Sequence, residues 1–199
     1  MSVAATEKVT RAPGAELDEL TLVRAQRGED AACRLFVTTY QRRIFALLHR
    51  MLGPSGRAAL VEDLAQETFL RAFRALAHFD RGGPARLSTW LLTIATRLAL
   101  DELKKPVPRL VPIDALARGV AGAGDAGADA DRRALQGALA RAVAALGPEQ
   151  RATFLLREVH ELSTEEVAAA LEVDLGTVKS RLSRAKQALR AALAEVHDE

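Results

Sequence analysis

The sequence has a single cysteine, Cys33, and few aromatic residues, which make up 4% of its 199 positions. One cysteine excludes an intramolecular disulfide and a cysteine-rich zinc cluster, so we expect Cys33 to be a small core residue. The four histidines lie far apart in the chain and form no close pair of metal ligands. These absences predict a protein without a metal or any other cofactor.

Long apolar runs are also lacking. No segment approaches the ~20 apolar residues that a transmembrane helix needs, and the N-terminus has no signal-peptide core. We therefore expect a soluble, cytoplasmic protein that does not insert into a membrane. The chain also has no recognisable nucleophile–base constellation and no phosphate-binding loop, which argues against an enzyme.

Residues that favour helix are abundant, because alanine, leucine and arginine are common. Helical patterns separated by glycine and proline turns fill a first block over residues 16–105 and a second over residues 132–196. The expected helices are Glu16–Arg27, Asp30–Met51, Ala58–His78 and Ser88–Lys105 in the first block, and Arg132–Leu146, Pro148–His160, Thr164–Leu171 and Leu175–Val196 in the second. The sequence therefore predicts an all-α fold of two small helical domains.

Between the blocks, residues 106–131 contain Pro106, Pro108 and Pro112, four glycines and no aromatic residue. Such a segment cannot bury enough apolar surface to offset the entropy lost on ordering. We expect it to be a flexible linker, and we expect residues 1–15 to be a disordered tail.

The end of the second block has the outline of a helix-turn-helix. Ser163 and Glu166 predict a capping box at the start of the shorter helix, and Asp174 can cap the longer one. Although the whole chain has a net charge of only +2, residues 175–193 hold five cations and no acid. Complementation of the helix dipole accounts for a cation near the C-terminus, but not for the absence of acids from the first turns. The pattern favours an anion-binding surface.

The last helix divides into faces at about 100° per residue. Its apolar stripe comprises Leu175, Val178, Leu182, Ala185 and Leu189. The opposite face carries Thr177, Ser180, Ser183 and Arg184, with Lys179, Arg181 and Lys186 at its edges. In a helix-turn-helix, the opposite face would meet DNA base edges and the flanking cations would meet phosphates. Arg184 is the expected base reader, since an arginine fork pairs with guanine.

A second pattern lies in the first block, in VEDLAQETFLRAFRAL, residues 61–76. Its buried stripe is expected to comprise Val61, Leu64, Phe69, Ala72, Phe73 and Leu76. Asp63, Gln66, Glu67 and Arg74 point away from that stripe, so the first half of the exposed face is acidic.

These residues resemble a known family, the extracytoplasmic-function sigma factors of bacterial RNA polymerase. Its sigma-2 domain is similar to EDLAQETFLRAFRAL followed by FDRGGPARLSTWLLTIATRLALDELKK, and its sigma-4 domain is similar to ELSTEEVAAALEVDLGTVKSRLSRAKQALR. The resemblance runs from about residue 17 to 193, in the family's order. The sequence departs from the family at Leu87, where phenylalanine is common, and at Arg97, where asparagine is common.

The resemblance implies a sigma factor that directs RNA polymerase core to promoters. Residues 16–105 would dock on core, chiefly on the β′ coiled coil and also on β, and would recognise and melt the minus-10 element, while residues 132–196 would recognise the minus-35 element. The implied core-binding residues are Asp63, Leu64, Gln66, Glu67, Phe69, Leu70 and Arg74. The implied minus-10 residues are Arg86, Thr89, Trp90, Thr93, Arg97 and Lys104, after a base-capturing loop at 79–86. The implied minus-35 residues are Lys179, Ser180, Arg181, Ser183 and Arg184, to which the helical wheel adds Thr177. An anti-sigma factor is a further implied partner.

Two other interpretations remain open. The chain could be a stand-alone helix-turn-helix regulator whose first block is a sensor or dimerisation module. It could also be an interaction protein that binds core polymerase or a regulator without binding DNA. Core-dependent initiation separates the first of these from a sigma factor, and a promoter footprint separates the second.

Overall fold

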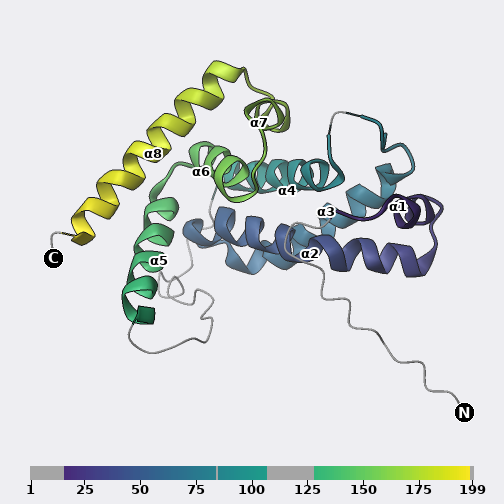
Figure 1. Ribbon diagram of the computed structural model, residues 1–199, viewed down its shortest axis with the longest axis horizontal. Helices are drawn as coiled ribbons and strands as arrows, with labels where there is room; N and C mark the ends of the chain where they lie inside the picture. Colours follow the sequence, from purple (N-terminus) through teal and green to yellow (C-terminus); the bar gives the residue numbers. More distant parts are fainter. Residues whose placement is uncertain (1–15, 84, 107–127, 198–199) are drawn as a thin grey trace, which may run out of the picture.

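The computed structural model describes residues 16–83, 85–106 and 128–197, and this part of the chain contains helices and no strand (Figure 1). The first block forms α1 (Glu19–Gln26), α2 (Asp30–Leu52), α3 (Val61–Leu76) and α4 (Leu87–Lys104). The second forms α5 (Ala128–Ala145), α6 (Pro148–Phe154), α7 (Thr164–Leu171) and α8 (Leu175–His197). The all-α prediction is confirmed. The predicted tail, and the predicted linker over residues 107–127, lie outside the described residues.

Most helix boundaries differ from the predicted ones by one to three residues, as where α1 begins at Glu19 instead of Glu16, and three differences go further. α5 begins at Ala128, four residues inside the expected linker. The segment expected as Ala58–His78 opens with a 3-10 turn, η2 (Ala58–Leu60), after another short turn, η1 (Gly53–Ser55). The segment expected as Pro148–His160 changes after α6 into a π-helical turn, η4 (Leu155–Val159). There the His160 amide donates to the Leu155 carbonyl at 3.0 Å, which is an i to i+5 bond.

The predicted helix caps are present. Ser163 accepts a hydrogen bond from the Glu166 amide at 3.1 Å, and the Glu166 carboxylate accepts one from the Ser163 amide at 2.7 Å. Asp174 accepts from the Thr177 amide at 2.7 Å at the start of α8. These bonds satisfy amides that have no partner within their own helix, so they fix where α7 and α8 begin.

Most of the scarce aromatic residues lie in the first helical unit, and Phe154 of α6 is the exception. Phe36 of α2 is fully buried, and its ring lies 6.0 Å from that of Phe69 and 5.3 Å from that of Phe73, both on α3. Tyr40 is buried one turn further along α2 and donates its hydroxyl to Glu16 at 2.8 Å. Burial raises the pKa of Tyr40 well above its usual range. Cys33 lies half-buried at the edge of this core.

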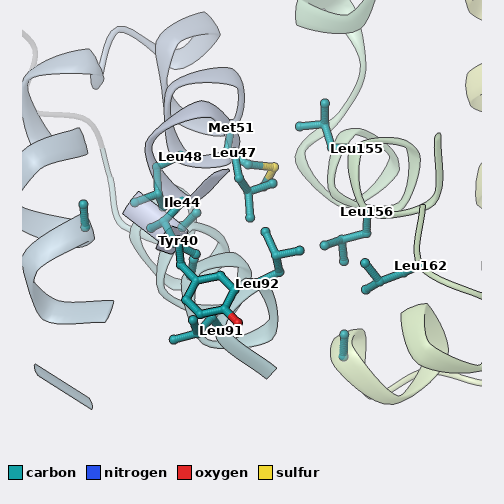
Figure 2. Close-up of a cluster of buried hydrophobic side chains, with 14 of the residues drawn as sticks. Tyr40, Ile44, Leu47, Leu48, Met51, Leu91, Leu92, Leu155, Leu156 and Leu162 are labelled. Atoms are coloured by element: carbon teal, nitrogen blue, oxygen red, sulfur yellow. The ribbon is translucent and has the colours of Figure 1, made fainter. Parts of the chain in front are cut away.

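The two helical units also share one apolar core. Leu47 and Met51 of α2 and Leu92 of α4 lie in one cluster with residues of the second unit (Figure 2). The second unit contributes Leu155 and Leu156 from η4, 1% and 0% exposed, and Leu162, 3% exposed. The units are therefore packed against each other, in addition to being joined by the chain.

Arg151 of α6 is a buried polar link between the units and is only 3% exposed. Its guanidinium donates to the Met51 carbonyl at 2.7 Å, at the end of α2. It also donates to carbonyls at the end of α5, those of Val143, Ala144 and Leu146, at 2.6–3.2 Å. Burial lowers the pKa of Arg151. Because helix C-termini carry partial negative charge, one cation stabilises the ends of two helices from different units.

Candidate nucleic-acid and protein interfaces

The predicted reading face of α8 is open to solvent. Ser180, Ser183 and Arg184 are exposed, and within the described part of the chain Arg184 takes part in no hydrogen bond or ion pair. Thr177 is half-buried and bonds to Asp174 through its amide and its hydroxyl, both at 2.7 Å. These bonds hold the pKa of Asp174 below its usual range. The Ser180 hydroxyl donates to the Thr177 carbonyl at 3.0 Å, and the Arg184 guanidinium is exposed beside it at the middle of one helix face.

The buried stripe of α8 is narrower than predicted. Val178, Ala185 and Leu189 are buried and Leu182 is half-buried, but Leu175 is 42% exposed, so the prediction was wrong for Leu175. At about 100° per residue, Leu175 lies roughly 60° around the helix from Val178, at the edge of the stripe. It is also in the first turn, ahead of the position where the helix meets its neighbours.

The flanking cations of α8 differ in their surroundings. Arg181 is 19% exposed and forms an ion pair with Glu149 at the start of α6. Lys186 forms an ion pair with Glu158 at 3.0 Å, whereas Lys179 is exposed. Arg181 also lines a hollow of about 370 Å³ between α4, α6 and α7. The structure therefore leaves Lys179 and Arg184 more available to an anionic ligand than Arg181.

The predicted docking helix, α3, presents a polar face. Asp63, Gln66, Leu70 and Arg74 are exposed, and Leu70 is 50% exposed. Glu67 and Leu64 are half-buried, and Glu67 accepts from Arg71 at 2.6 Å. Phe69 is different, because it is 8% exposed and packs on Phe36. Six of the seven predicted docking residues therefore reach the surface of α3, and Phe69 supports them from inside.

Four of the six predicted minus-10 residues form no hydrogen bond or ion pair with the second unit within the described part of the chain. Arg86 is exposed at the N-cap of α4, and exposed Lys104 pairs with Asp101 at 3.0 Å. Half-buried Trp90 lies with its ring 5.1 Å from that of Phe79. Thr93 is half-buried and donates to the Thr89 carbonyl at 2.8 Å.

The other two are bonded to the chain segment that forms α7, and of these Thr89 is buried, whereas the Arg97 side chain is still 46% exposed. Thr89 is 6% exposed, and its hydroxyl donates to the Glu166 carboxylate at 3.0 Å. Arg97 donates to the carbonyls of Ala170 and Ala169 at 3.0 and 3.2 Å, and pairs with Glu172 at 2.9 Å. One face of α4 is thus bonded to the second helical unit.

A cavity of about 360 Å³ lies at the start of α4, where the sequence predicts a base-capturing loop. Its lining includes Phe79, Trp90, His78 and Asp80. One Asp80 oxygen accepts from the Gly82 amide at 2.9 Å, which holds the loop in a turn. Two adjacent aromatic rings beside a carboxylate form a surface on which a planar, hydrogen-bonding group can lie.

Sequence reasoning did not identify Arg151, Glu166 or Glu172 as contacts between the units. Arg151 gave one usable signal, since it stands one turn before Leu155 on the buried side of its helix. Glu166 was expected only as a cap residue, and Glu172 only as part of a turn. Within the described residues, no group of His, Cys, Asp and Glu could hold a metal ion, and no helix is long and apolar enough to cross a membrane.

Comparisons with known proteins match both units. The family described as Sigma-70 region 2 matches residues 36–106, and Sigma-70, region 4 matches residues 136–189. The chain is 32% identical to the ECF RNA polymerase sigma factor SigW of Bacillus subtilis over 181 residues, which cover 86% of this chain and 94% of SigW. It is also 32% identical to the ECF RNA polymerase sigma-E factor of Escherichia coli K12, covering 86% of this chain and 92% of that protein.

Two solved structures have the same fold. CnrH, in complex with the cytosolic domain of CnrY, aligns with a TM-score of 0.60 at 22% identity, over 88% of this chain and 96% of CnrH. The sigma factor RpoE of Bartonella quintana, in complex with the anti-sigma factor NepR, aligns with a TM-score of 0.55 at 23% identity, over 80% of this chain and 96% of RpoE.

Proposed function

The chain belongs to the extracytoplasmic-function sigma factors of the sigma-70 family, and from this premise we propose how its residues divide the work of promoter recognition. As a sigma factor, it binds RNA polymerase core and directs transcription initiation at specific promoters. We assign core docking and the minus-10 element to residues 16–105, and the minus-35 element to residues 132–196. The observation that carries this division is that one chain presents an acidic helix face on α3 and a basic one on α8.

Core docking is assigned to the exposed face of α3. Asp63 and Glu67 supply negative charge, and Leu70 supplies exposed apolar surface beside them. A surface of this kind pairs with a basic protein surface, here the β′ coiled coil of core, and repels the DNA backbone. We also assign to residues 16–105 a contact with the β subunit of core polymerase. Phe69 acts indirectly, by holding α3 on Phe36.

Recognition of the minus-10 element is assigned to α4 and the loop before it. The cavity beside Phe79 and Trp90 is suited to an extruded base, because aromatic rings stack on any base. Arg86, Arg97 and Lys104 would hold the neighbouring phosphates, and Thr89 and Thr93 lie between them. These contacts offset the cost of unstacking the duplex.

Recognition of the minus-35 element is assigned to α8. Arg184 and the hydroxyls of Ser180 and Ser183 face the base edges of the major groove, and Thr177 and Lys179 extend this surface. Arg181 has two possible roles. It either breaks its ion pair with Glu149 and contacts a phosphate, or keeps that ion pair and so positions α8. Arginine at guanine gives about 1–3 kcal/mol of discrimination, so Arg184 is the principal reader.

The protein acts by binding and strand opening, without covalent chemistry of its own, in the cytoplasm where its polymerase works. An anti-sigma factor is the proposed regulatory partner, since the solved relatives CnrH and RpoE were each seen in complex with a partner chain, which for RpoE is an anti-sigma factor. The stand-alone regulator is not favoured, because residues 36–106 match Sigma-70 region 2 and leave no room there for a separate sensor module.

Run-off transcription with purified core polymerase tests this function. Overexpression of the chain should raise the level of some transcripts, and the genomic fragments upstream of these transcripts serve as templates. Sequence elements that the fragments share identify the promoter. Transcripts should start at that promoter when chain and core are both present. No initiation above core alone would reject the sigma factor assignment.

A further inference from the structure

The loop between α3 and α4 is held at both of its ends by α1 and the residues just before it. This loop carries Phe79, and it leads into the first turn of α4 and Trp90, so its two ends bring together the rings that wall the cavity. The residues lining that cavity come from α3, the loop and α4. Figure 1 shows α1 beside the end of α3 from which the loop leaves. A segment that does not line the cavity therefore holds the two points between which the cavity forms.

Gln26, in the last turn of α1, holds the start of the loop. Its side-chain amide donates one hydrogen bond to the Leu76 carbonyl and one to the Phe79 carbonyl, both at 3.0 Å. The Leu76 carbonyl is among the last four of α3, which have no amide partner within a regular helix. Because an amide nitrogen has two hydrogens, both donors of Gln26 are used here. The backbone of Phe79 is thus tied to a residue 53 positions earlier in the chain.

Glu16 holds the other end of the loop. α4 begins at Leu87, and neither its N-cap residue, Arg86, nor its first turn offers a carboxylate to the free amides there. Glu16 supplies the missing acceptor, because its carboxylate accepts from the Ser88 amide at 3.4 Å and from the Ser88 hydroxyl. A carboxylate also meets the partial positive charge at a helix N-terminus. α4 therefore takes its cap from a residue 72 positions away.

The Glu16 carboxylate is itself fixed by α2. The Tyr40 hydroxyl donates to it at 2.8 Å and accepts from the Leu17 amide at 2.9 Å. Tyr40 is 1% exposed, so its ring cannot shift without repacking of the core. Arg43, one turn further along α2, lies 4.0 Å from the same carboxylate. The first turn of α4 is therefore tied through Glu16 to a buried side chain of α2.

A third contact between α1 and the loop differs from these two. Glu19 and Arg81 form an ion pair at 3.5 Å, and the Glu19 side chain is 82% exposed. An exposed ion pair of this kind contributes little to holding a structure. It provides a comparison within the same molecule, since it joins the same helix to the same loop.

We propose that Glu16 and Gln26 are positioning residues of the minus-10 pocket, which hold Phe79 and Trp90 in the arrangement that receives an extruded base. This inference rests on the proposed function of the loop and α4. Stacking on a base requires van der Waals contact over the face of a ring, so it depends on where the two rings lie. Loss of either anchor leaves both rings in the chain but no longer fixes their arrangement.

Base preference in the holoenzyme tests this role. The probes are two forked fragments of the mapped promoter, alike except that one has an abasic site at the minus-10 position where removal of the base weakens binding most. Gln26→Met keeps the length of the side chain and removes both donors, so it should reduce the preference for the base over the abasic site roughly 3- to 10-fold. Glu16→Ala should reduce it about as much. Glu16→Gln keeps one acceptor oxygen for Ser88 and should retain most of the preference, and Glu19→Ala should leave it within about 2-fold.

Two controls separate positioning from loss of stability. Gln41→Met makes the same substitution at an exposed position of α2 and should leave the preference unchanged. Leu48→Val removes a buried methylene from the core of the first unit, so it should lower the melting temperature and leave the preference unchanged. The proposal is overturned if Gln26→Met and Glu16→Ala both leave the preference unchanged, or if Leu48→Val lowers it as much as they do.

Fluorescence of Trp90, the only tryptophan of the chain, tests the same positioning without DNA. Gln26→Met should shift its emission to longer wavelength, because release of Phe79 exposes the indole ring to water, and Gln41→Met should not. An emission spectrum that Gln26→Met does not change would contradict the proposal. If the emission shifts as expected but the wild-type holoenzyme shows no preference for a base at any minus-10 position, the assigned function of the cavity is what fails.

Discussion

The two helices assigned to DNA, α4 and α8, meet their surroundings differently. On α8, Ser180, Ser183 and Arg184 are exposed and Arg184 has no partner in the described part of the chain. On α4, Thr89 is 6% exposed and Arg97 is bonded to α7. The reading face of α8 is therefore open as it stands, whereas Thr89 of α4 would have to leave Glu166 before it could meet the minus-10 strand. The two helices therefore differ in how much the contact between the units already occupies them.

The most disruptive change to that contact is at Arg151. Arg151→Met should lower the free energy of unfolding by about 3–5 kcal/mol, because it leaves buried carbonyls at the ends of α2 and α5 without a donor. Urea denaturation at pH 7 measures this loss. Arg190→Met, at an exposed position of α8, is the control and should change stability by less than about 0.5 kcal/mol. A loss below about 1 kcal/mol at Arg151 would show that the link contributes little.

Charge reversal on α3 should have the next largest effect, on binding of core polymerase. Asp63→Arg with Glu67→Arg should weaken binding of core polymerase at least about 30-fold, since like charges would then face a basic partner surface. Surface-immobilised core and the full chain give this affinity. Asp101→Arg with Glu161→Arg reverses two exposed acids elsewhere and should leave binding within about 3-fold. If both doubles bind alike, the docking face is not on α3.

Acid pH should destabilise the fold through protonation of His160, which follows η4 in the contact between the two units. Burial, with Arg50 and Arg43 of α2 nearby, lowers the pKa of His160 from 6.5 to about 4, and its Nε2 has no hydrogen-bond partner among the residues that the structure describes. The unfolded chain therefore binds a proton between these values while the folded chain does not, so stability is full above pH 6.5 and falls as pH decreases toward 4. Between pH 7 and pH 5 the loss should be about 2 kcal/mol.

Urea denaturation of the wild type and of His160→Leu at both pH values isolates this effect. The variant cannot take up the proton, so its stability should fall less between pH 7 and pH 5, by the same amount of about 2 kcal/mol. Parallel losses in the two proteins would mean that another group titrates.

The smallest expected effect concerns α8, the helix whose predicted reading face is exposed. Arg184→Ala should reduce discrimination between the minus-35 element and a scrambled duplex by about 1–2 kcal/mol, roughly 5- to 30-fold, and leave core affinity unchanged. Competition binding with the holoenzyme measures the ratio. Arg190→Ala removes an exposed cation one to two turns further along and should lower affinity for both duplexes equally. Unchanged discrimination in Arg184→Ala would move the reading face elsewhere.

Local rules predicted most of the helices and the accessible site on α8. Capping by Ser163 and Asp174 depends on neighbours within three residues, so the sequence contains the whole signal. The helical wheel of α8 also predicted that Ser180 and Arg184 are exposed. It failed for Leu175 because the buried stripe of α8 is narrower in the first turn.

Contacts between the units could not be predicted in this way. Arg97 and Ala170 are 73 residues apart, and no helical period connects them. Buried Arg151 satisfies carbonyls on two other helices, a role that depends on where those helices end. The same limit applies to Phe69, which the family resemblance assigned to docking and which the fold places in the core. Sequence patterns describe each helix by itself, whereas the burial of its side chains depends on which other helix packs against it.

Permanganate footprinting of the mapped promoter tests the central claim most directly, since it detects unpaired thymines at the minus-10 element. The free chain should leave these thymines unreactive, and adding core polymerase should make them reactive, less so with Arg97→Ala. Thymines that react without core, or that stay unreactive with chain and core together, would contradict the account.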